Sequence, residues 1–435
     1  MKNSRMLIYS GNGYIFNEIY LPIINEMTHI WDIDLIISDF CLAEHTKKSV
    51  ADLLDTKKIQ SLKIIHAYND NKNNIKHHFN LWKSLKEYKR VPYKLLILGS
   101  DFHVIDRYLI HYAKKNNTKI ALVLSHTLAQ ILEKYLSAQG KLKKDPNYSF
   151  AFPRPNIKNF TQTPGIAKKI KKLTIIFKYI KMYWKIIADR ILNQYVCPFI
   201  FTGSFFRNIE EDVLGFTSGR GDAVIVYDEL EFKAMQKIVP KAKSVFIAQH
   251  PSVFFCHCEK NADQKNKKNI LVLISGHCSK ELEGEKINRI SDTINRAIDF
   301  LDPNEIHLRF HPRTDKNLKW PRLVYNSLNH NACAIKIVES MDVELPSIIC
   351  DYMGVIGVIS GSLQIARAAC KNIFVVALAN CGDPMVNGDS WMLGGTKGIR
   401  IINDGEQLER EDLIPIQNSI NKYPMAAQVL DTLVS

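Results

Sequence analysis

Short β-rich runs alternate with amphipathic helical patterns along much of this 435-residue chain, and this alternation is the strongest constraint on its fold. The runs form two series, one in each half of the sequence. The first comprises MLIYS (6–10), DLIIS (34–38), LKIIHA (62–67), KLLILGS (94–100) and KIALVLS (119–125), and the second NILVLIS (269–275), EIHLRFH (305–311), CAIKIV (333–338), GVISG (357–361) and NIFVVAL (372–378). Strands that alternate with helices predict a parallel sheet covered on both faces. We therefore expect an α/β protein with two doubly wound, Rossmann-type domains.

The domain boundaries follow from composition. The segment CEKNADQKNKKN (258–269) is polar, lysine-rich and without periodicity, as interdomain linkers are. We expect an N-terminal Rossmann-like domain over 1–250, a linker over 251–268 and a C-terminal Rossmann-like domain over 269–415. A C-terminal helix is expected within 416–435, with packing against the N-terminal domain as one option. Because ligands of open α/β sheets bind at the carboxyl ends of the strands, the two domains should face each other across a cleft.

The overall composition is that of a globular protein. Its 46% hydrophobic and 23% charged residues suit two ordinary cores. The apolar run before Ser10 is too short for a signal peptide, and no stretch of about 18 uncharged apolar residues follows it. Nine irregularly spaced cysteines suggest reduced thiols. We expect a cytoplasmic protein that does not cross a membrane.

A net charge of +14 implies attraction to polyanions such as nucleic acid, an anionic membrane or an acidic sugar nucleotide. Lysines are concentrated in 165–195, opposite an apolar and aromatic helical face. This helix either packs on the N-terminal domain with its lysines in water or lies on the inner face of the cytoplasmic membrane. Because no RNA-binding or helix-turn-helix signature occurs, we do not expect nucleic acid as a partner.

Two short motifs in the second half predict a phosphate site. His311 and Arg313 should emerge at the carboxyl end of a strand, with Pro312 fixing the turn between them. Ser360-Gly361-Ser362 opens a helical pattern, where backbone N–H groups and the helix dipole suit an anion. Ordinary capping explains each motif alone, but their pairing about 50 residues apart in one domain favours phosphate binding.

The segments HLRFHPR and VIGVISGSLQIARAA resemble the His-Pro and Ser-Ser motifs of bacterial sialyltransferases, polysialyltransferases and related capsule or lipopolysaccharide glycosyltransferases of the GT-B fold. The resemblance covers roughly 245–380, including the lead-in VFIAQHP (245–251), whereas the N-terminal half is similar only in the order of its elements. It implies a GT-B-like architecture, in which the domain over 1–250 is the acceptor side and the domain over 269–415 binds the nucleotide sugar. It also implies a CMP-activated acidic sugar as donor and no cofactor. It also implies that His311 contacts the donor phosphate, that Pro312 holds the loop and that Ser360 and Ser362 bind the phosphate from the other side.

The general base is where the chain departs from the family's pattern. Family members place two carboxylates and a glycine in the N-terminal domain, whereas the strand KIALVLS is followed here by His126. His126 and Asp101, each at the carboxyl end of an expected strand, are the candidates for a base that deprotonates the acceptor hydroxyl. An imidazole has a suitable pKa without perturbation, which favours His126 slightly. Structural roles remain open for both, since Asp101 could cap the following helix.

Further candidates for substrate contact follow other expected strands. The loop Gly11-Asn12-Gly13 allows close backbone approach on the acceptor side, but it lacks the G-x-G-x-x-G pattern of a dinucleotide site. Ser275, Gly276 and His277 either touch the nucleotide or form an ordinary turn. Glu344 could accept hydrogen bonds from a ribose or a base.

No metal site is expected. Asp32-Ile33-Asp34 leads into its strand instead of leaving it, so these carboxylates would lie at the wrong edge of the sheet. The cluster His250, Cys256, His257 and Cys258 contains adjacent residues that would point to alternate sides of an extended segment.

The motifs predict an inverting, metal-independent glycosyltransferase, and the resemblance implies that it moves a sialic acid or related nonulosonate from a CMP-sugar to a lipopolysaccharide or capsule acceptor. Two alternatives stay open. One is a GT-B-like transferase with another donor, such as CMP-Kdo, CDP-glycerol or a UDP-sugar. The other is a non-enzymatic assembly protein that binds polyanions.

Overall fold

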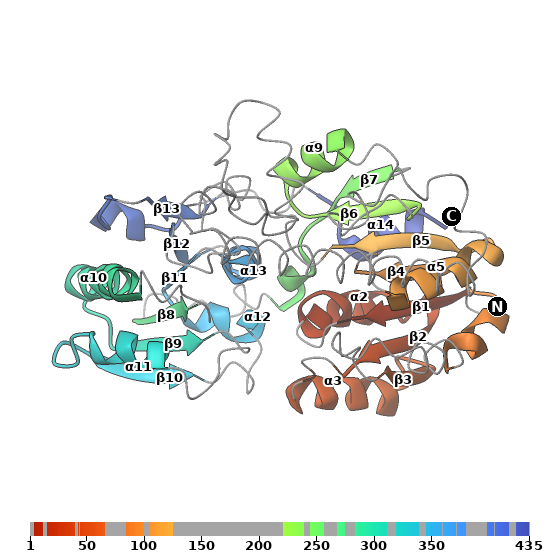
Figure 1. The fold of residues 1–435 in the computed structure, drawn as a ribbon, viewed down its shortest axis with the longest axis horizontal. Coiled ribbons are helices and arrows are strands. Elements are labelled where there is room, and N and C mark those ends of the chain that lie inside the picture. The colour runs from red at the N-terminus through yellow and green to blue at the C-terminus, as the bar shows by residue number, and fades with distance from the viewer. Residues whose placement is uncertain are drawn as a thin grey trace, which may run out of the picture.

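Two parallel β-sheets organise the chain, each in its own lobe of the molecule (Figure 1). The computed structural model describes residues 4–11, 15–39, 42, 44–65, 84–99, 104–124, 221–238, 244–255, 268–274, 283–310, 319–338, 345–358, 360–370, 372–379, 398–403, 405–416 and 423–434.

The first sheet has seven parallel strands in the order β3-β2-β1-β4-β5-β6-β7. They are β1 (Ser4–Ser10), β2 (Trp31–Ser38), β3 (Ser61–Ile65), β4 (Leu95–Leu98), β5 (Lys119–Val123), β6 (Ala223–Val226) and β7 (Ser244–Ile247). The helical segments are η1 (Phe16–Tyr20), α2 (Leu21–Met27), α3 (Glu44–Asp55), η2 (Lys86–Arg90), α5 (Val104–Lys115), α9 (Glu229–Ile238) and η5 (Pro251–Phe255). We call this sheet with its covering helices the first lobe.

The second sheet has six parallel strands in the order β10-β9-β8-β11-β12-β13, and with its helices it forms the second lobe. They are β8 (Asn269–Ile274), β9 (Glu305–Phe310), β10 (Ala334–Val338), β11 (Gly354–Val358), β12 (Phe374–Leu378) and β13 (Arg400–Ile402). The helical segments in this part are α10 (Glu283–Leu301), α11 (Lys319–Asn326), α12 (Leu345–Ile348), η8 (Ile349–Asp351), α13 (Gly361–Ala369) and η10 (Arg410–Leu413), and α14 (Ala426–Thr432) follows them.

The central strands are buried on both faces, which explains their continuous apolar runs. In β1, Met6 and Ile8 pack into one cluster with α2, while Leu7 and Tyr9 pack into another with α5. The second sheet repeats the arrangement, since one of its clusters includes α10 and the other includes α13. Side chains alternate between the faces of a strand, so each sheet is the middle layer of a three-layer lobe.

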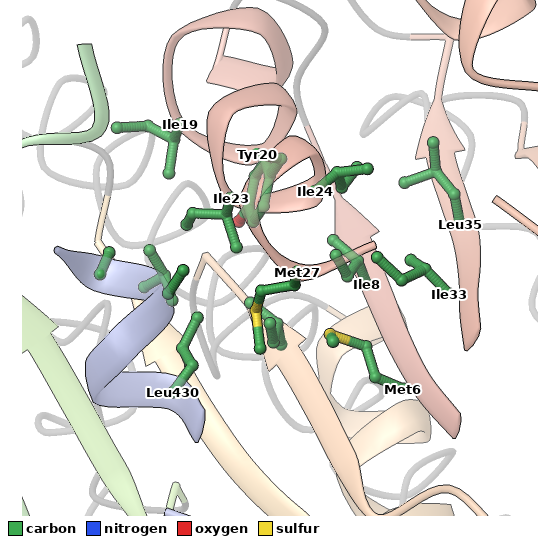
Figure 2. Packing of buried hydrophobic residues seen from close by; sticks show 14 of the residues in the cluster. Met6, Ile8, Ile19, Tyr20, Ile23, Ile24, Met27, Ile33, Leu35 and Leu430 are labelled. Atoms are coloured by element: carbon green, nitrogen blue, oxygen red, sulfur yellow. The ribbon is translucent and has the colours of Figure 1, made fainter. Parts of the chain in front are cut away.

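The end of the chain belongs to the first lobe, although it follows the second in sequence. Leu430 of α14 packs in the same cluster as Met27 of α2 and Met6 of β1 (Figure 2). The indole N–H of Trp31 also donates a hydrogen bond to the Asp431 carboxylate at 3.4 Å. The first core is therefore completed by a helix that lies about 400 positions away along the chain from its neighbours.

The chain segments that join the lobes are bonded to each other. The backbone N–H of Gln249, just before η5, donates to the carbonyl of Pro424 at 2.8 Å, and its side-chain amide donates to the carbonyl of Tyr423 at 2.6 Å. Gln249 also forms a parallel bridge with Met425. Tyr423 is anchored in turn by its hydroxyl, which donates to Glu229 at 2.6 Å.

The predicted fold class is confirmed, because both sheets are parallel and doubly wound. β11 covers 354–358 instead of 357–361, and Gly361 belongs to α13. β6, β7 and β13 were not predicted from the sequence. Within the part of the chain that the structure describes, none of the helices combines the length and apolarity needed to cross a bilayer.

Candidate functional site at the two switch points

Both sheets have a point where the strand order reverses. In the first sheet the chain proceeds outward from β1 to β2 and β3, then returns to β4 on the other side of β1. In the second sheet β8 and β11 are the corresponding pair. The loops at the carboxyl ends of such a pair diverge, and ligands of open α/β sheets bind in the space between them. The fold therefore predicts two ligand sites, one at the carboxyl ends of β1 and β4 and one at those of β8 and β11.

The motif Ser360-Gly361-Ser362 lies at the second of these switch points. Ser360 has an extended backbone (φ −161°, ψ 162°) and is the N-cap of α13, and its carbonyl accepts the N–H of Leu363 at 3.2 Å. Its hydroxyl makes no capping hydrogen bond to the helix. All three motif residues are partly exposed. The first-turn N–H groups, the dipole and the hydroxyls can therefore bind an anion.

Close packing beneath α13 holds this helix against β11 and β8. A methyl group added at Gly357 would lie 2.8 Å from the carbonyl oxygen of Leu273 in β8 and 3.2 Å from the Leu363 side chain. Only glycine lets β11 approach β8 and α13 this closely. Leu363, Ala366 and Ala369 on the inner face of α13 are fully buried, which orients the opposite face and the helix start.

Arg289 of α10 stabilises the carboxyl edge of the second sheet. Its guanidinium donates to the carbonyl of Ala379 at 2.6 Å and to the carbonyl of Ile402 at 2.8 Å, at the ends of β12 and β13. This role of Arg289 was not predicted, because an arginine in an amphipathic helix carries no local sign that it reaches strand ends so far away along the chain.

At the first switch point, the glycines lie over buried tyrosines. Gly11 is exposed after β1, and a methyl group there would be 3.3 Å from the Tyr9 hydroxyl. A methyl group at Gly99, directly after β4, would be 2.7 Å from the Tyr20 hydroxyl. Tyr20 ends η1, a π-helical segment, and such segments are rare and frequent at functional sites. The two glycine backbones therefore rest on phenol groups.

A buried carboxylate accompanies these tyrosines. Asp106, in the first turn of α5, is 2% exposed. Burial raises the pKa of both Tyr9 and Tyr20, and the negative charge of Asp106 raises each further. The phenols therefore stay protonated as hydrogen-bonding groups. Sequence reasoning missed Asp106, although an acidic residue beside the apolar Ile105, Leu109 and Ile110 of the same helix was a possible signal.

Most of the predicted site residues lie outside the described residues. These are Asn12, Gly13, Asp101, His126, Ser275, Gly276, His277, His311, Pro312, Arg313 and Glu344. The strands that lead toward several of them are described, and they end at Leu98, Val123, Ile274 and Phe310. Their roles stay predictions. Among the described candidates, Gly11 lies at the first switch point and Ser360, Gly361 and Ser362 at the second.

The short helix η5 connects the two switch points. In the first lobe it contacts η1, which follows β1, and also α2; in the second it contacts α12 and α13. Figure 1 shows α12 and α13 on the side of the second lobe that faces the first. The helical segments that leave the two switch points therefore meet on the same linking segment.

Asp32 and Asp34 lie inside β2 instead of leading into it as predicted, and the Asp34 carboxylate already has partners. This carboxylate is 1% exposed and lies 2.6 Å from the Arg5 guanidinium. It accepts further hydrogen bonds from the hydroxyls of Ser61 at 2.6 Å and Tyr93 at 2.7 Å. Across the described ranges no group of three or more His, Cys, Asp or Glu side chains is placed to hold a metal ion. Asp34 thus ties β2 to β1 and β3.

Comparison with known proteins shows a fold but no family. No protein-family model matches the chain, and no curated protein is similar to it. Among solved structures, a UDP-N-acetylglucosamine 2-epimerase from Methanocaldococcus jannaschii has 14% identity and a TM-score of 0.53, covering 100% of this chain and 98% of its own. A Listeria monocytogenes protein provisionally named a UDP-N-acetylglucosamine 2-epimerase has 8% identity and a TM-score of 0.52, covering 94% of this chain and 86% of its own. The chain has a GT-B-like fold of two Rossmann-type domains.

Proposed function

We propose that this chain is a nucleotide-sugar-using enzyme, and that its activity is inverting, metal-independent transfer of a sugar to an acceptor hydroxyl. The observation that carries the proposal is the start of α13. A partly exposed Ser-Gly-Ser turn at a switch point presents neutral donors where a phosphate can bind. The GT-B-like fold, in which a second switch point shares the linking helix η5, supports a site for a second substrate.

In the proposed mechanism, the chain's own donors stabilise the leaving nucleotide. Negative charge grows on the departing phosphate while the sugar gains oxocarbenium character. The N-terminus of α13, with Ser360 and Ser362, would bind that phosphate on one side, and His311 and Arg313 on the other. One preorganised donor of this kind is worth about 3 kcal/mol in a transition state. The proposed base, His126 or Asp101, takes the proton of the acceptor hydroxyl.

Two observations favour different sugar donors. The sequence resemblance favours a CMP-activated nonulosonate and a lipopolysaccharide or capsule acceptor. The structural neighbours act, by their names, on UDP-N-acetylglucosamine. We therefore extend the proposal to other nucleotide-linked donors, namely UDP-sugars, CMP-Kdo and CDP-glycerol.

A second candidate function is epimerisation of a nucleotide sugar. The similarity to two proteins named as 2-epimerases over 94% and 100% of this chain favours it. An epimerase acts on one nucleotide sugar alone, whereas a transferase needs an acceptor. Sugar turnover without any acceptor would therefore favour epimerisation.

Thermal-shift measurements test the proposal and select the donor. A ligand present at 100 times its dissociation constant stabilises the folded state by about 2.7 kcal/mol. We expect a cytidine or uridine nucleotide to raise the melting temperature, and the best one to identify the donor class. If no nucleotide shifts melting while polyanions bind with a steep salt dependence, a polyanion-binding protein replaces the enzyme.

A further inference from the structure

Tyr227 and His250 lie at the carboxyl ends of neighbouring strands in the first lobe. Tyr227 directly follows β6, and His250 lies between β7 and η5. The two segments are joined by the N–H of Ala248, which donates to the carbonyl of Val226 at 2.9 Å. Because η5 contacts α13 across the junction, His250 stands where the lobes meet. The mechanism proposed above does not use this histidine.

The His250 ring is held in one orientation and one tautomer. Its Nδ1 accepts the backbone N–H of Ser252 at 3.1 Å, and the Tyr227 ring lies against it with 4.7 Å between centroids. In a neutral imidazole the accepting nitrogen carries no proton, so the proton is on Nε2. Burial lowers the pKa of His250 to about 3. At neutral pH the ring is therefore an uncharged N–H donor and neither a cation nor a base.

Two buried hydroxyl groups, those of Tyr227 and Ser252, belong to the same two segments. The Ser252 side chain is fully buried, and the Tyr227 hydroxyl is buried too. Neither oxygen forms a hydrogen bond within the described residues. A buried hydroxyl without a partner lowers stability, so each such group in a native fold calls for an explanation. Tyr227 and His250 are partly exposed as whole residues, so this group of side chains lies near the surface of the lobe.

We propose that the Nε2–H of His250 and the hydroxyls of Tyr227 and Ser252 form a site for the phosphate oxygens of the bound nucleotide. We call these three residues the His250 site. All three groups can donate a hydrogen bond, and an anionic oxygen accepts several at once. Ser252 belongs to the linking helix η5, which α13 also contacts, so the site would bind a phosphate from the first lobe. This inference rests on the proposed use of a nucleotide sugar.

The variants separate the proposed role from a structural one. His250→Asn keeps an acceptor for the Ser252 N–H, because an asparagine side chain bonds the backbone two residues on. It removes the donor at Nε2. His250→Gln brings an amide N–H near that position and should restore part of the binding. Tyr227→Phe and Ser252→Ala remove only unpartnered hydroxyls, so their melting temperatures should equal or exceed that of the wild type.

Calorimetric titration of the full chain with CMP and UDP measures the effect. For whichever nucleotide binds, we expect His250→Asn to weaken the affinity by about ten- to a hundredfold, and each hydroxyl variant by about three- to tenfold. Binding of the corresponding nucleoside should not change. The matched control is His307→Asn in β9, whose ring nitrogens are both bonded, to Tyr352 at 2.8 Å and Glu305 at 2.7 Å. Nucleotide affinities within twofold of the wild type in all three site variants would overturn the inference.

A wild-type protein that binds no nucleotide would defeat the proposed function, and the His250 site is then tested by itself. Inorganic phosphate is titrated into protein labelled with ¹⁵N-histidine, and the His250 signals are assigned by their loss in His250→Asn. A saturable shift of Nε2 on phosphate addition supports a phosphate site. Unchanged signals would overturn it.

Discussion

The two switch points are built from different chemistry on similar frameworks. In the first lobe, the glycines after β1 and β4 rest on Tyr9 and Tyr20, whose phenols stay protonated beside the Asp106 carboxylate. In the second lobe, small residues open α13 and expose backbone donors. The first arrangement suits precise placement of hydroxyl groups, and the second suits an anion. In the proposed transferase, this difference would assign the acceptor to the first lobe and the donor to the second.

The largest expected effect concerns the base in the first lobe. His126→Ala should lower the turnover rate by about a hundred- to ten-thousandfold, because general base catalysis contributes that much. It should also abolish the loss of activity below about pH 6.5, where an imidazole becomes protonated. The pH dependence of the turnover rate measures both. If Asp101→Asn instead shows this loss and His126→Ala does not, the assignment moves to Asp101.

The next effect concerns the second lobe. His311→Ala should lower turnover by about a hundred- to a thousandfold through lost stabilisation of the leaving phosphate. The fold should stay intact, as measured by circular dichroism and the melting temperature. An unaltered rate would remove His311 from the site and leave α13 as the phosphate-binding element.

Matched glycine substitutions compare the packing of the two switch points. Gly357→Ala should lower the free energy of unfolding by about 1–3 kcal/mol, because the added methyl group meets the backbone of β8 and overpacks the core. The nearest atoms to a methyl group at Gly11 are those of the Tyr9 side chain, and Gly11 is exposed, so Gly11→Ala should change stability by less than about 0.5 kcal/mol. Urea unfolding measures both. Equal losses of unfolding free energy in the two variants would contradict the tighter packing at Gly357 in β11.

His250 should make stability depend on pH. Its pKa falls from an ordinary 6.5 to about 3 on folding, so between these values the unfolded chain binds a proton that the folded chain does not. The free energy of unfolding should therefore decrease on acidification below about pH 6.5, by at most about 1.4 kcal/mol per pH unit from this residue. His250→Asn should flatten the profile measured by urea unfolding. An unchanged slope would show that the ring titrates normally.

The smallest expected effect is that of metal removal. With backbone and side-chain donors binding the phosphate, EDTA should leave turnover within about twofold of the untreated rate. The measurement is turnover with the donor chosen by thermal shift, with and without EDTA. Full dependence on a divalent ion would contradict the proposal that the chain's own donors bind the leaving phosphate without a metal ion.

The sequence predicted the parts of the fold that rest on local pattern. The apolar runs leading to β1, β8 and β9 were recognisable because strands buried on both faces need continuous hydrophobic sequence. The short strands β6 and β13 were not, since four and three residues carry too little pattern. The Ser360 turn was predictable from its residue types. The buried Asp106 beside Tyr9 and Tyr20 and the His250 site could not be predicted, because they depend on contacts between distant segments.

The packing of α14 has a practical consequence for dividing the molecule. A fragment that ends before β8 would lack Leu430 and the Asp431 partner of Trp31, and it would expose the apolar surface that they cover. Such a fragment should aggregate when expressed alone. Supplying residues 423–434, through a short engineered connection after η5 or as a separate peptide, should restore its solubility, whereas the second sheet carries its own core and should tolerate loss of that tail.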